Sequence, residues 1–441
     1  MKGIRVVGWL LRALVAKLLV LNIGLAQAED YLPTPRVAAQ SWLLMDHESG
    51  EVLAQGNADA RVDPASLVKI MTSYVLGQAL QGGAVEAHDR VTIDTDASAA
   101  GNAQLQGSSL MFLKPGDRVT IDDLNKGIVI QSGNDACIAV ADYLAGSEQA
   151  FVDAMNEQAR LLGMLNTQFK TVHGLAAEGQ FSSARDMALL SRALIEQLPA
   201  EYALYKQKAF SFNQVVQHNR NRLLWSTSLA VDGLKTGNSA AGGYSLVTSA
   251  VLDGRRLIAV VLGAESDRLR FQESEKLLKW GFRAFETVTP IKADEVFVSK
   301  RVWFGDTHNV KLNAGAHPAI SVPYGQADDV SVSAILDSPE LHAPLQVGQV
   351  VGVVNFQIGS RHIAEKPLVV MEAVDEGGWF SRAWDFLLLK LYQWLGVCLL
   401  CNGEGAYEQL PALPAACHVH ARDGSLQYRP RCQRAPFACD G

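Results

Sequence analysis

Cysteine is nearly absent from most of this chain. Of the six cysteines, Cys137 alone precedes residue 398, and the other five crowd the C-terminal end: Cys398, Cys401, Cys417, Cys432 and Cys439. The main body therefore has no disulfide framework and must fold on a hydrophobic core. With 441 residues, 48% of them hydrophobic, the chain is long enough for two domains with such cores.

Positive charge is scarce as well. Lys and Arg number 39 against 46 Asp and Glu, which gives a formal net charge of −7 at pH 7. Proteins that bind nucleic acid present a basic patch or stripe to the phosphates. This sequence has no such stripe, so we expect no nucleic-acid partner.

The N-terminus lacks an apolar run long enough to cross a membrane. A basic leader is followed by apolar residues from Leu18 to Ala26, well short of the ~20 that a spanning helix needs. Ala26-Gln27-Ala28 has the small-x-small pattern at which signal peptides are cleaved. We therefore predict a cleaved secretory signal over residues 1–28, with an uncleaved N-terminal anchor as the alternative.

The chain changes character at Thr289-Pro290. The part before it mixes short strands with amphipathic helices: strands over 41–46, 52–54, 245–251 and 257–262, and helices that open at Asp63-Pro64 and cover 135–144 and 270–285. After it, residues 291–374 lack a helical stripe and contain short β-rich runs separated by Gly, Pro, Asp and Asn. An α/β domain followed by a small all-β domain is the prediction.

A helical stripe returns after Gly377-Gly378. Apolar residues recur at helical spacing, and the polar residues fall on the other side: the apolar set is Phe380, Ala383, Trp384, Leu387, Leu388, Leu391, Trp394 and Leu395, and the polar set is Arg382, Asp385 and Gln393. The tryptophans favour a helix that lies on a membrane surface. A helix packed on a core and a spanning helix are the alternatives.

The last segment, residues 397–441, is rich in Pro, Gly, Ala and Cys and has no sustained period, so we expect disorder. Its cysteines and histidines imitate a zinc site, namely Cys398, Cys401, Cys417, His418 and His420. A loose tail offers no outer hydrogen bonds to hold such ligands. We therefore predict no metal and no cofactor.

Ser66-Leu67-Val68-Lys69 places a hydroxyl and an amine three residues apart. On a helix these positions share a face, so the Lys69 amine can approach the Ser66 hydroxyl and act as its general base. Alone this is weak, because a Ser-x-x-Lys arises by chance roughly once in a chain of this length. Ser66 does lie in the first turn after a proline, among apolar neighbours, where a nucleophile would be displayed.

Two further boxes stand at the ends of predicted elements. Ser132-Gly133-Asn134 precedes an apolar helix. It is consistent with a turn in which Ser132 caps the helix. It is equally consistent with a site in which the Ser132 hydroxyl relays a proton and the Asn134 amide binds the substrate. Lys235-Thr236-Gly237 opens the β-hairpin and suits either a surface turn or a binding site for a terminal carboxylate beside an open strand edge. The three boxes are informative only together.

In this order the boxes resemble the signature of the penicillin-recognising serine enzymes. The wider sequence is similar to the low-molecular-mass penicillin-binding proteins that are D-alanyl-D-alanine carboxypeptidases. The segments that carry the resemblance lie between about residue 30 and Gly396: residues 63–67, 107–116, 131–137, 171–175, 219–225 and 303–306.

The resemblance implies the catalytic roles. Ser66 would be the nucleophile that forms the acyl-enzyme, and Lys69 would be its base and later the activator of the deacylating water. Ser132 and Lys235 would relay the proton to the leaving D-alanine.

The resemblance also implies the substrate contacts. Asn134 would hold the substrate amide, and backbone N–H groups of Ser66 and Asn238 would form the oxyanion hole. The terminal carboxylate would meet Thr236, Arg220 and Arg270, and Gly237 would let the substrate backbone lie against the strand edge. His173 has no place in any motif, and we expect it to be structural.

The family organisation would divide the chain into five parts: a signal peptide (1–28), an α/β penicillin-binding, serine β-lactamase-like domain (29–288), a β-sandwich domain (289–375), an amphipathic anchor helix (376–396) and an unmatched tail (397–441). The implied partners are peptidoglycan stem peptides ending in D-Ala-D-Ala, β-lactam antibiotics and the periplasmic face of the inner membrane, contacted through residues 379–395. A homodimer is a further expectation.

Three other functions compete with a carboxypeptidase. A class A β-lactamase shares the boxes but has a Glu-x-x-Leu-Asn loop, which is missing between Ser132 and Lys235. A transpeptidase shares the catalytic residues, and a catalytically silent wall-binding scaffold would not need them intact. Asn238 occupies a position that varies in the family, which leaves the shape of the carboxylate pocket open.

Overall fold

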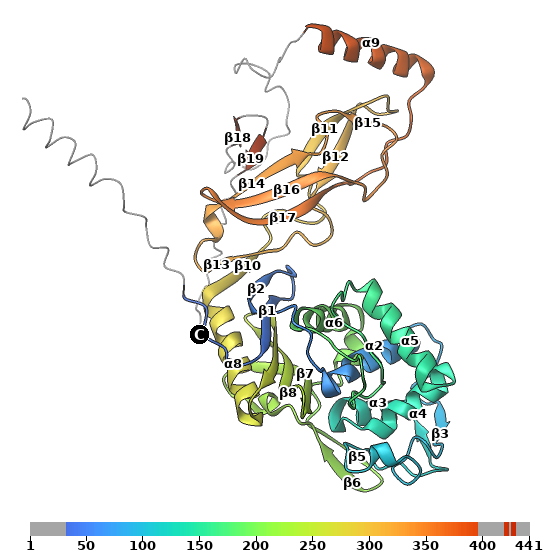
Figure 1. Ribbon diagram of the computed structural model, residues 1–441. Helices are drawn as coiled ribbons and strands as arrows, with labels where there is room; N and C mark the ends of the chain where they lie inside the picture. Colours follow the sequence, from blue (N-terminus) through green and yellow to red (C-terminus); the bar gives the residue numbers. More distant parts are fainter. Residues whose placement is uncertain (1–31, 396–418, 423–424, 429–441) are drawn as a thin grey trace, which may run out of the picture. The chain divides into compact units, whose positions relative to one another are not determined.

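The structure is a computed structural model that describes residues 32–395, 419–422 and 425–428 (Figure 1). The predicted signal segment and most of the tail, with the cysteines of the imitated zinc site, lie outside the described residues. The predicted order of an α/β domain, an all-β domain and a C-terminal helix is confirmed.

An antiparallel sheet of five strands forms the centre of the α/β domain. Its order is β2-β1-β9-β8-β7, with bounds Val52–Gly56 for β2, Ser41–Asp46 for β1, Arg255–Ala264 for β9, Gly243–Leu252 for β8 and Ala230–Ser239 for β7. The middle residues of β8 and β9 are buried without alternation. Both faces of these strands are therefore covered, which explains their continuous apolar sequence.

Helices pack on both faces of this sheet (Figure 1). On one face, α8 (Asp267–Ala284) buries Leu277 and Leu278 against apolar side chains of β1 and β9. On the other face, α2 (Val68–Gln81) and α6 (Ala184–Gln197) share one core cluster with β1 and β9. The remaining elements are α3 (Ile121–Lys126), α4 (Asn134–Ala145), α5 (Glu148–Leu161), α7 (Pro199–Tyr202), β3 (Arg90–Thr92), β4 (Arg118–Thr120), β5 (Ala209–Phe212) and β6 (Val215–His218).

Serine hydroxyls cap the N-termini of three of the helices. Ser147, Ser183 and Ser266 each accept a hydrogen bond from the backbone N–H three residues further on, which satisfies a donor that the helix cannot. These caps fix where α5, α6 and α8 start, and they are readable in the sequence.

The all-β domain has one strand before the predicted boundary. β10 (Phe285–Val288) pairs with β13 (Ile320–Pro323). The larger sheet has the order β15-β11-β12-β17-β16-β14-β19-β18, formed by β11 (Val298–Trp303), β12 (Asn309–Asn313), β14 (Val330–Leu336), β15 (Leu341–His342), β16 (Val350–Ile358) and β17 (Arg361–Val370). The tail, for which the sequence indicates no order, contributes β18 (Val419–Arg422) and β19 (Ser425–Tyr428), and β19 pairs with the edge of β14.

The C-terminal helix α9 covers Trp379–Leu395, as the stripe predicts. Asp385, on its polar side, is only 1% exposed. Its carboxylate accepts hydrogen bonds from the Arg301 guanidinium at 3.0 Å and from the Phe304 backbone N–H at 2.8 Å. Asp385 thus attaches α9 to the all-β domain. Within the described part of the chain, no helix combines the length and apolar character needed to span a bilayer.

Candidate active site

The first box lies in a 3-10 turn, Ala65–Leu67, and α2 begins only at Val68. Ala65 has φ of 47°, a left-handed conformation that interrupts a regular helix. Asp63 accepts hydrogen bonds from the Ala65 backbone N–H at 3.0 Å and from the Ser239 hydroxyl at 2.6 Å. The predicted helix-capping aspartate therefore ties the end of β7 to the turn that presents Ser66.

Lys69 is fully buried, with three oxygen atoms around its Nζ. Nζ lies 3.2 Å from Ser66 Oγ and 2.7 Å from Asn134 Oδ1, and it also donates to the backbone carbonyl of His173. Burial lowers the pKa of Lys69 to about 8, because the charged ammonium loses its hydration; the positive charge of Arg220 adds to this. The structure thus brings together the hydroxyl, the amine and the amide that the sequence assigns to the site.

Ser132 and Lys235 are also buried. Ser132 is 1% exposed, has φ of 66° and offers an Oγ without a hydrogen-bond partner among the described residues. The Lys235 Nζ donates to the Thr236 carbonyl at 3.2 Å. Burial, followed by the charges of Lys69, Arg220 and Arg270, lowers the pKa of Lys235 well below its ordinary value. This cluster of cationic groups favours an anionic ligand such as a carboxylate.

Gly237 allows β7 to lie against the turn that carries Ser66. A Cβ atom at this position would stand 2.9 Å from the Pro64 carbonyl oxygen and 3.2 Å from Leu67 Cγ. Such contacts are too short for an ordinary side chain, so the glycine in this box meets a steric requirement of the fold. Thr236, immediately before it, is 5% exposed.

The two arginines assigned to the substrate carboxylate differ in their surroundings. Arg270 is 6% exposed; it donates to the carbonyls of Gly237 at 2.8 Å and Ser245 at 3.3 Å, and it forms an ion pair with Asp267. These contacts hold the ends of β7 and β8 in place. Arg220 is exposed, which leaves it the better placed of the two to meet a substrate.

Three residues outside the predicted set support this site. His173 contributes its carbonyl to Lys69, while burial and then the charge of Lys69 lower the pKa of its imidazole to about 3. The Cys137 thiol donates to the Gly133 carbonyl at 3.2 Å. Asp135 accepts hydrogen bonds from two backbone N–H groups of the 107–116 segment, at 2.8 and 3.0 Å, and so joins that segment to the second box. No sequence motif predicts these contacts. The contact of His173 uses its backbone carbonyl, which every residue has, and those of Cys137 and Asp135 depend on the tertiary fold.

No cluster of three or more His, Cys, Asp or Glu side chains suited to a metal ion occurs in the described ranges.

Two family models match this chain. Residues 28–266 match the D-alanyl-D-alanine carboxypeptidase model, and residues 285–376 match the penicillin-binding protein 5 C-terminal domain.

Matches to individual relatives cover most of the chain. D-alanyl-D-alanine carboxypeptidase DacC of Escherichia coli (strain K12) is 58% identical over 369 residues, covering 84% of this chain and 92% of the relative. DacA of the same strain is 50% identical over 390 residues, covering 87% and 97%. Penicillin binding protein 5 from Haemophilus influenzae, known from crystal structures, is 42% identical with a TM-score of 0.74, covering 78% of this chain and 100% of that chain.

The contact at Gly237 predicts the effect of a single added carbon. We expect Gly237→Ala to push β7 away from the Ser66 turn and to slow acylation by a fluorescent penicillin about tenfold, since misplacing reacting groups by ~1 Å costs up to ~10²-fold in rate. The matched control is Gly378→Ala, because a Cβ there meets no atom within 4 Å. Equal labelling rates for Gly237→Ala and the parent would show that the close approach of β7 is not required.

Proposed function

This chain belongs to the D-alanyl-D-alanine carboxypeptidase family, and we propose that it removes the terminal D-alanine of peptidoglycan pentapeptides through an acyl-enzyme on Ser66. Its class, a serine-type carboxypeptidase that β-lactams acylate, follows from the family. The observation that carries the assignment to Ser66 is the buried Lys69 amine 3.2 Å from its hydroxyl.

In the acylation step, Ser66 Oγ attacks the carbonyl carbon of the penultimate D-alanine while its proton passes to Lys69. The depressed pKa of Lys69, about 8, keeps a usable fraction of the amine neutral near pH 7. The backbone N–H groups of Ser66 and Asn238 stabilise the oxyanion. The C–N bond then breaks, and the proton on Lys69 is relayed through Ser132 and Lys235 to the leaving D-alanine, which leaves Lys69 neutral again.

Deacylation reuses the same base. Lys69 removes a proton from a water molecule, whose oxygen attacks the acyl carbon, and the ester bond to Ser66 breaks as Oγ regains a proton. The product is the shortened peptide with a free carboxylate, and the enzyme returns to its starting state.

Substrate binding follows from the free hydrogen-bonding capacity of the site. Asn134 Oδ1 accepts from Lys69, so its amide N–H₂ is free to donate to the substrate carbonyl. Thr236 and Arg220 bind the terminal carboxylate, and Lys235 adds positive charge beneath them. Arg270 acts on this pocket through Gly237, whose carbonyl it holds.

The reaction is tested by release of free D-alanine from a peptide ending in D-Ala-D-Ala. We expect the parent chain to release it and Ser66→Ala to lose at least ~10³-fold in rate, as when an acyl-forming nucleophile is removed. Ser338→Ala, an exposed serine of the all-β domain, is the matched control. Penicillin uptake without D-alanine release would favour a transpeptidase or a stalled acyl-enzyme. Neither activity in a folded parent would favour a wall-binding scaffold.

The pKa of Lys69 predicts the pH dependence of acylation. A base must be deprotonated, so the second-order rate of penicillin labelling should rise about tenfold per pH unit between pH 6 and 7 and level off above pH 8. His173 stays neutral throughout this range, because burial lowers its pKa to about 3. A labelling rate that is flat from pH 6 to pH 8 would exclude Lys69 as the titrating base.

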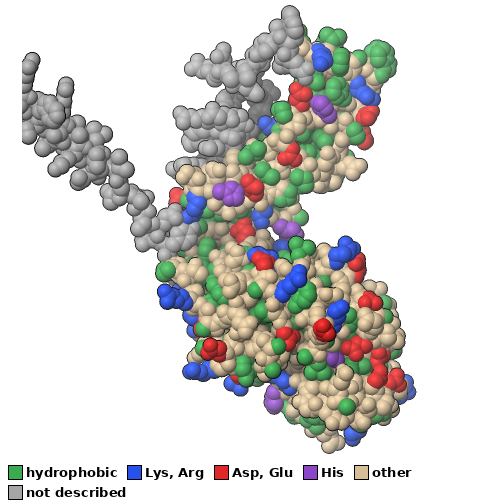
Figure 2. All heavy atoms as spheres, in the orientation of Figure 1, with side chains coloured by type: hydrophobic (Ala, Val, Ile, Leu, Met, Phe, Trp, Pro, Cys, Tyr) green, Lys and Arg blue, Asp and Glu red, His purple; other side chains and the backbone are tan. Residues whose placement is uncertain are grey.

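We further propose that the chain is exported by residues 1–28 and held at the periplasmic face of the inner membrane by α9. Large apolar side chains of this helix are exposed (Figure 2): Trp379 by 70%, Trp384 by 65% and Leu387 by 64%. Asp385 is bound to the all-β domain instead. A helix held to the protein through Asp385, with several large apolar side chains exposed, suits a lipid surface. Self-association through this helix stays a prediction.

Vesicle binding tests this attachment. We expect Trp384→Gln with Leu387→Gln to weaken co-sedimentation with phospholipid vesicles at least about tenfold, because two large apolar side chains would no longer enter the lipid. Tyr324→Gln, an exposed aromatic of the all-β domain (69% exposed), is the matched control. If the α9 double variant and the control bind vesicles equally, α9 is not the attachment site.

A further inference from the structure

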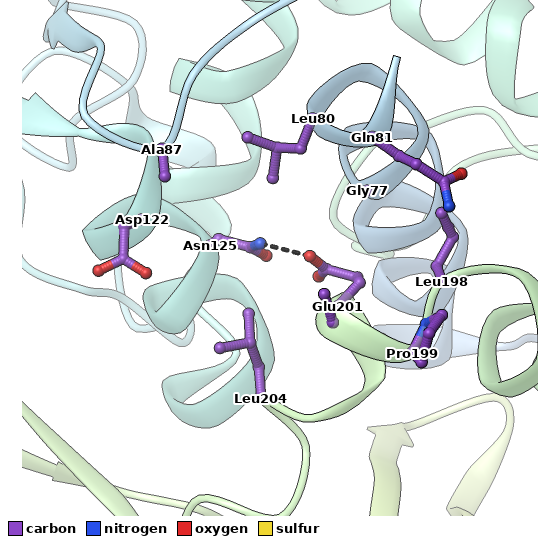
Figure 3. A pocket seen from close by; sticks show the side chains of 11 residues that line it. Gly77, Leu80, Gln81, Ala87, Asp122, Asn125, Leu198, Pro199, Glu201 and Leu204 are labelled. Atoms are coloured by element: carbon purple, nitrogen blue, oxygen red, sulfur yellow. Dashed lines mark hydrogen bonds between the residues drawn. The ribbon is translucent and has the colours of Figure 1, made fainter. Parts of the chain in front are cut away.

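A cavity of about 410 Å³ lies beside the C-terminal half of α2 (Figure 3). Its wall includes Gly77, which follows Lys69 by eight residues, or about 12 Å along a helix axis. α3 and the segment from Leu198 to Leu204 complete it. Its volume falls within the roughly 300–1,000 Å³ typical of small-molecule sites.

The polar end of the cavity is formed by two buried side chains, Glu201 and Asn125, which are 5% and 3% exposed. One oxygen of the Glu201 carboxylate accepts a hydrogen bond from the Ser73 hydroxyl, and the other accepts from Asn125 Nδ2 at 2.7 Å. A carboxylate offers about four acceptor positions, so Glu201 retains two. Asn125 Oδ1 has no hydrogen-bond partner among the described residues.

The rest of the lining is mostly apolar, with Gln81 and Asp122 as its other polar members. Figure 3 shows the side chains of Leu80, Leu198 and Leu204 around the cavity, with Ala87 pointing into it. A ligand that fits this lining therefore needs a hydrocarbon body and a head group rich in hydrogen-bond donors.

The charge of the polar end is negative when Glu201 is ionised. Burial raises the pKa of Glu201 to about 7; the hydrogen bonds from Ser73 and Asn125 oppose this, and the nearby charge of Asp122 adds to it. The cation on α3 next to Asp122, Lys126, is paired with Asp122 at 2.5 Å. Burial raises the pKa values of the nearby phenols of Tyr205 and Tyr202 far above neutrality.

We propose that this cavity binds a small primary amine with a short apolar body, with the ammonium group on Glu201 and the hydrocarbon against the leucines. The N–H donors of a primary ammonium match the two remaining acceptor positions of Glu201. This site is separate from the acyl-enzyme chemistry and does not depend on it.

Benzylamine is the probe, titrated into the full chain by calorimetry and ligand-observed NMR. Benzyl alcohol has the same body without the charge and serves as the matched ligand. We expect benzylamine to bind at least tenfold more tightly than benzyl alcohol. Glu201→Gln, which keeps the shape of the side chain, should abolish this preference. Binding should persist in Ser66→Ala, since the nucleophile takes no part.

The pH dependence gives a second readout. Benzylamine stays protonated from pH 6 to pH 8, while the ionised fraction of a group with pKa about 7 rises from about one-tenth to about nine-tenths. The affinity for benzylamine should therefore increase about tenfold over this range. The affinity for benzyl alcohol should not increase.

A blocking variant keeps the test independent of the stability of Glu201→Gln. Ala87 is exposed and points into the cavity. Ala87→Trp should therefore fill the cavity and weaken the binding of benzylamine at least tenfold. Ala84→Trp, an exposed neighbour that does not line the cavity, should bind like the parent. No saturable binding at millimolar benzylamine, or binding that Ala87→Trp leaves unchanged, would overturn the proposal and leave Glu201 as a link between α2 and α3.

Discussion

The desolvated amine of Lys69 is the constraint on which the rest of the catalytic domain depends. An ammonium without water is costly unless oxygen atoms surround it, and here they come from three separate segments: the Ser66 turn, the start of α4 at Asn134 and the carbonyl of His173. The same burial lowers the pKa of Lys69 to about 8. The arrangement that holds the lysine is therefore also the one that leaves part of its amine unprotonated near neutral pH.

Three contacts position strand β7 beside the Ser66 turn. Gly237 lets the backbone of β7 touch the turn, Asp63 ties its end through Ser239, and Arg270 holds its carbonyl from α8. Burial lowers the pKa of both Lys69 and Lys235, and the positive charge of Arg220 lowers both further. A bound carboxylate would relieve the repulsion between these cationic side chains. The site therefore favours an anionic ligand.

Local sequence signals predict the elements and the boxes but not how distant segments converge. The i, i+3 spacing of Ser66 and Lys69 predicts their contact, and apolar periodicity predicts α2, α4, α8 and α9 within a few residues. The 3-10 turn before α2 is missed because one left-handed residue, Ala65, sets it. The carbonyl of His173 and the inward guanidinium of Arg270 are missed because such contacts depend on tertiary packing, which leaves no periodic pattern in sequence.

Cys137 has a consequence for the behaviour of the chain outside catalysis. It is fully buried, and burial raises the pKa of its thiol to about 12, so it offers no thiolate for disulfide exchange. The folded domain therefore offers no thiolate to the cysteines of its own tail. The same thiol is a built-in reporter, because an alkylating reagent reaches it only when the structure around Cys137 opens. Its modification rate reports how often the surroundings of this residue open.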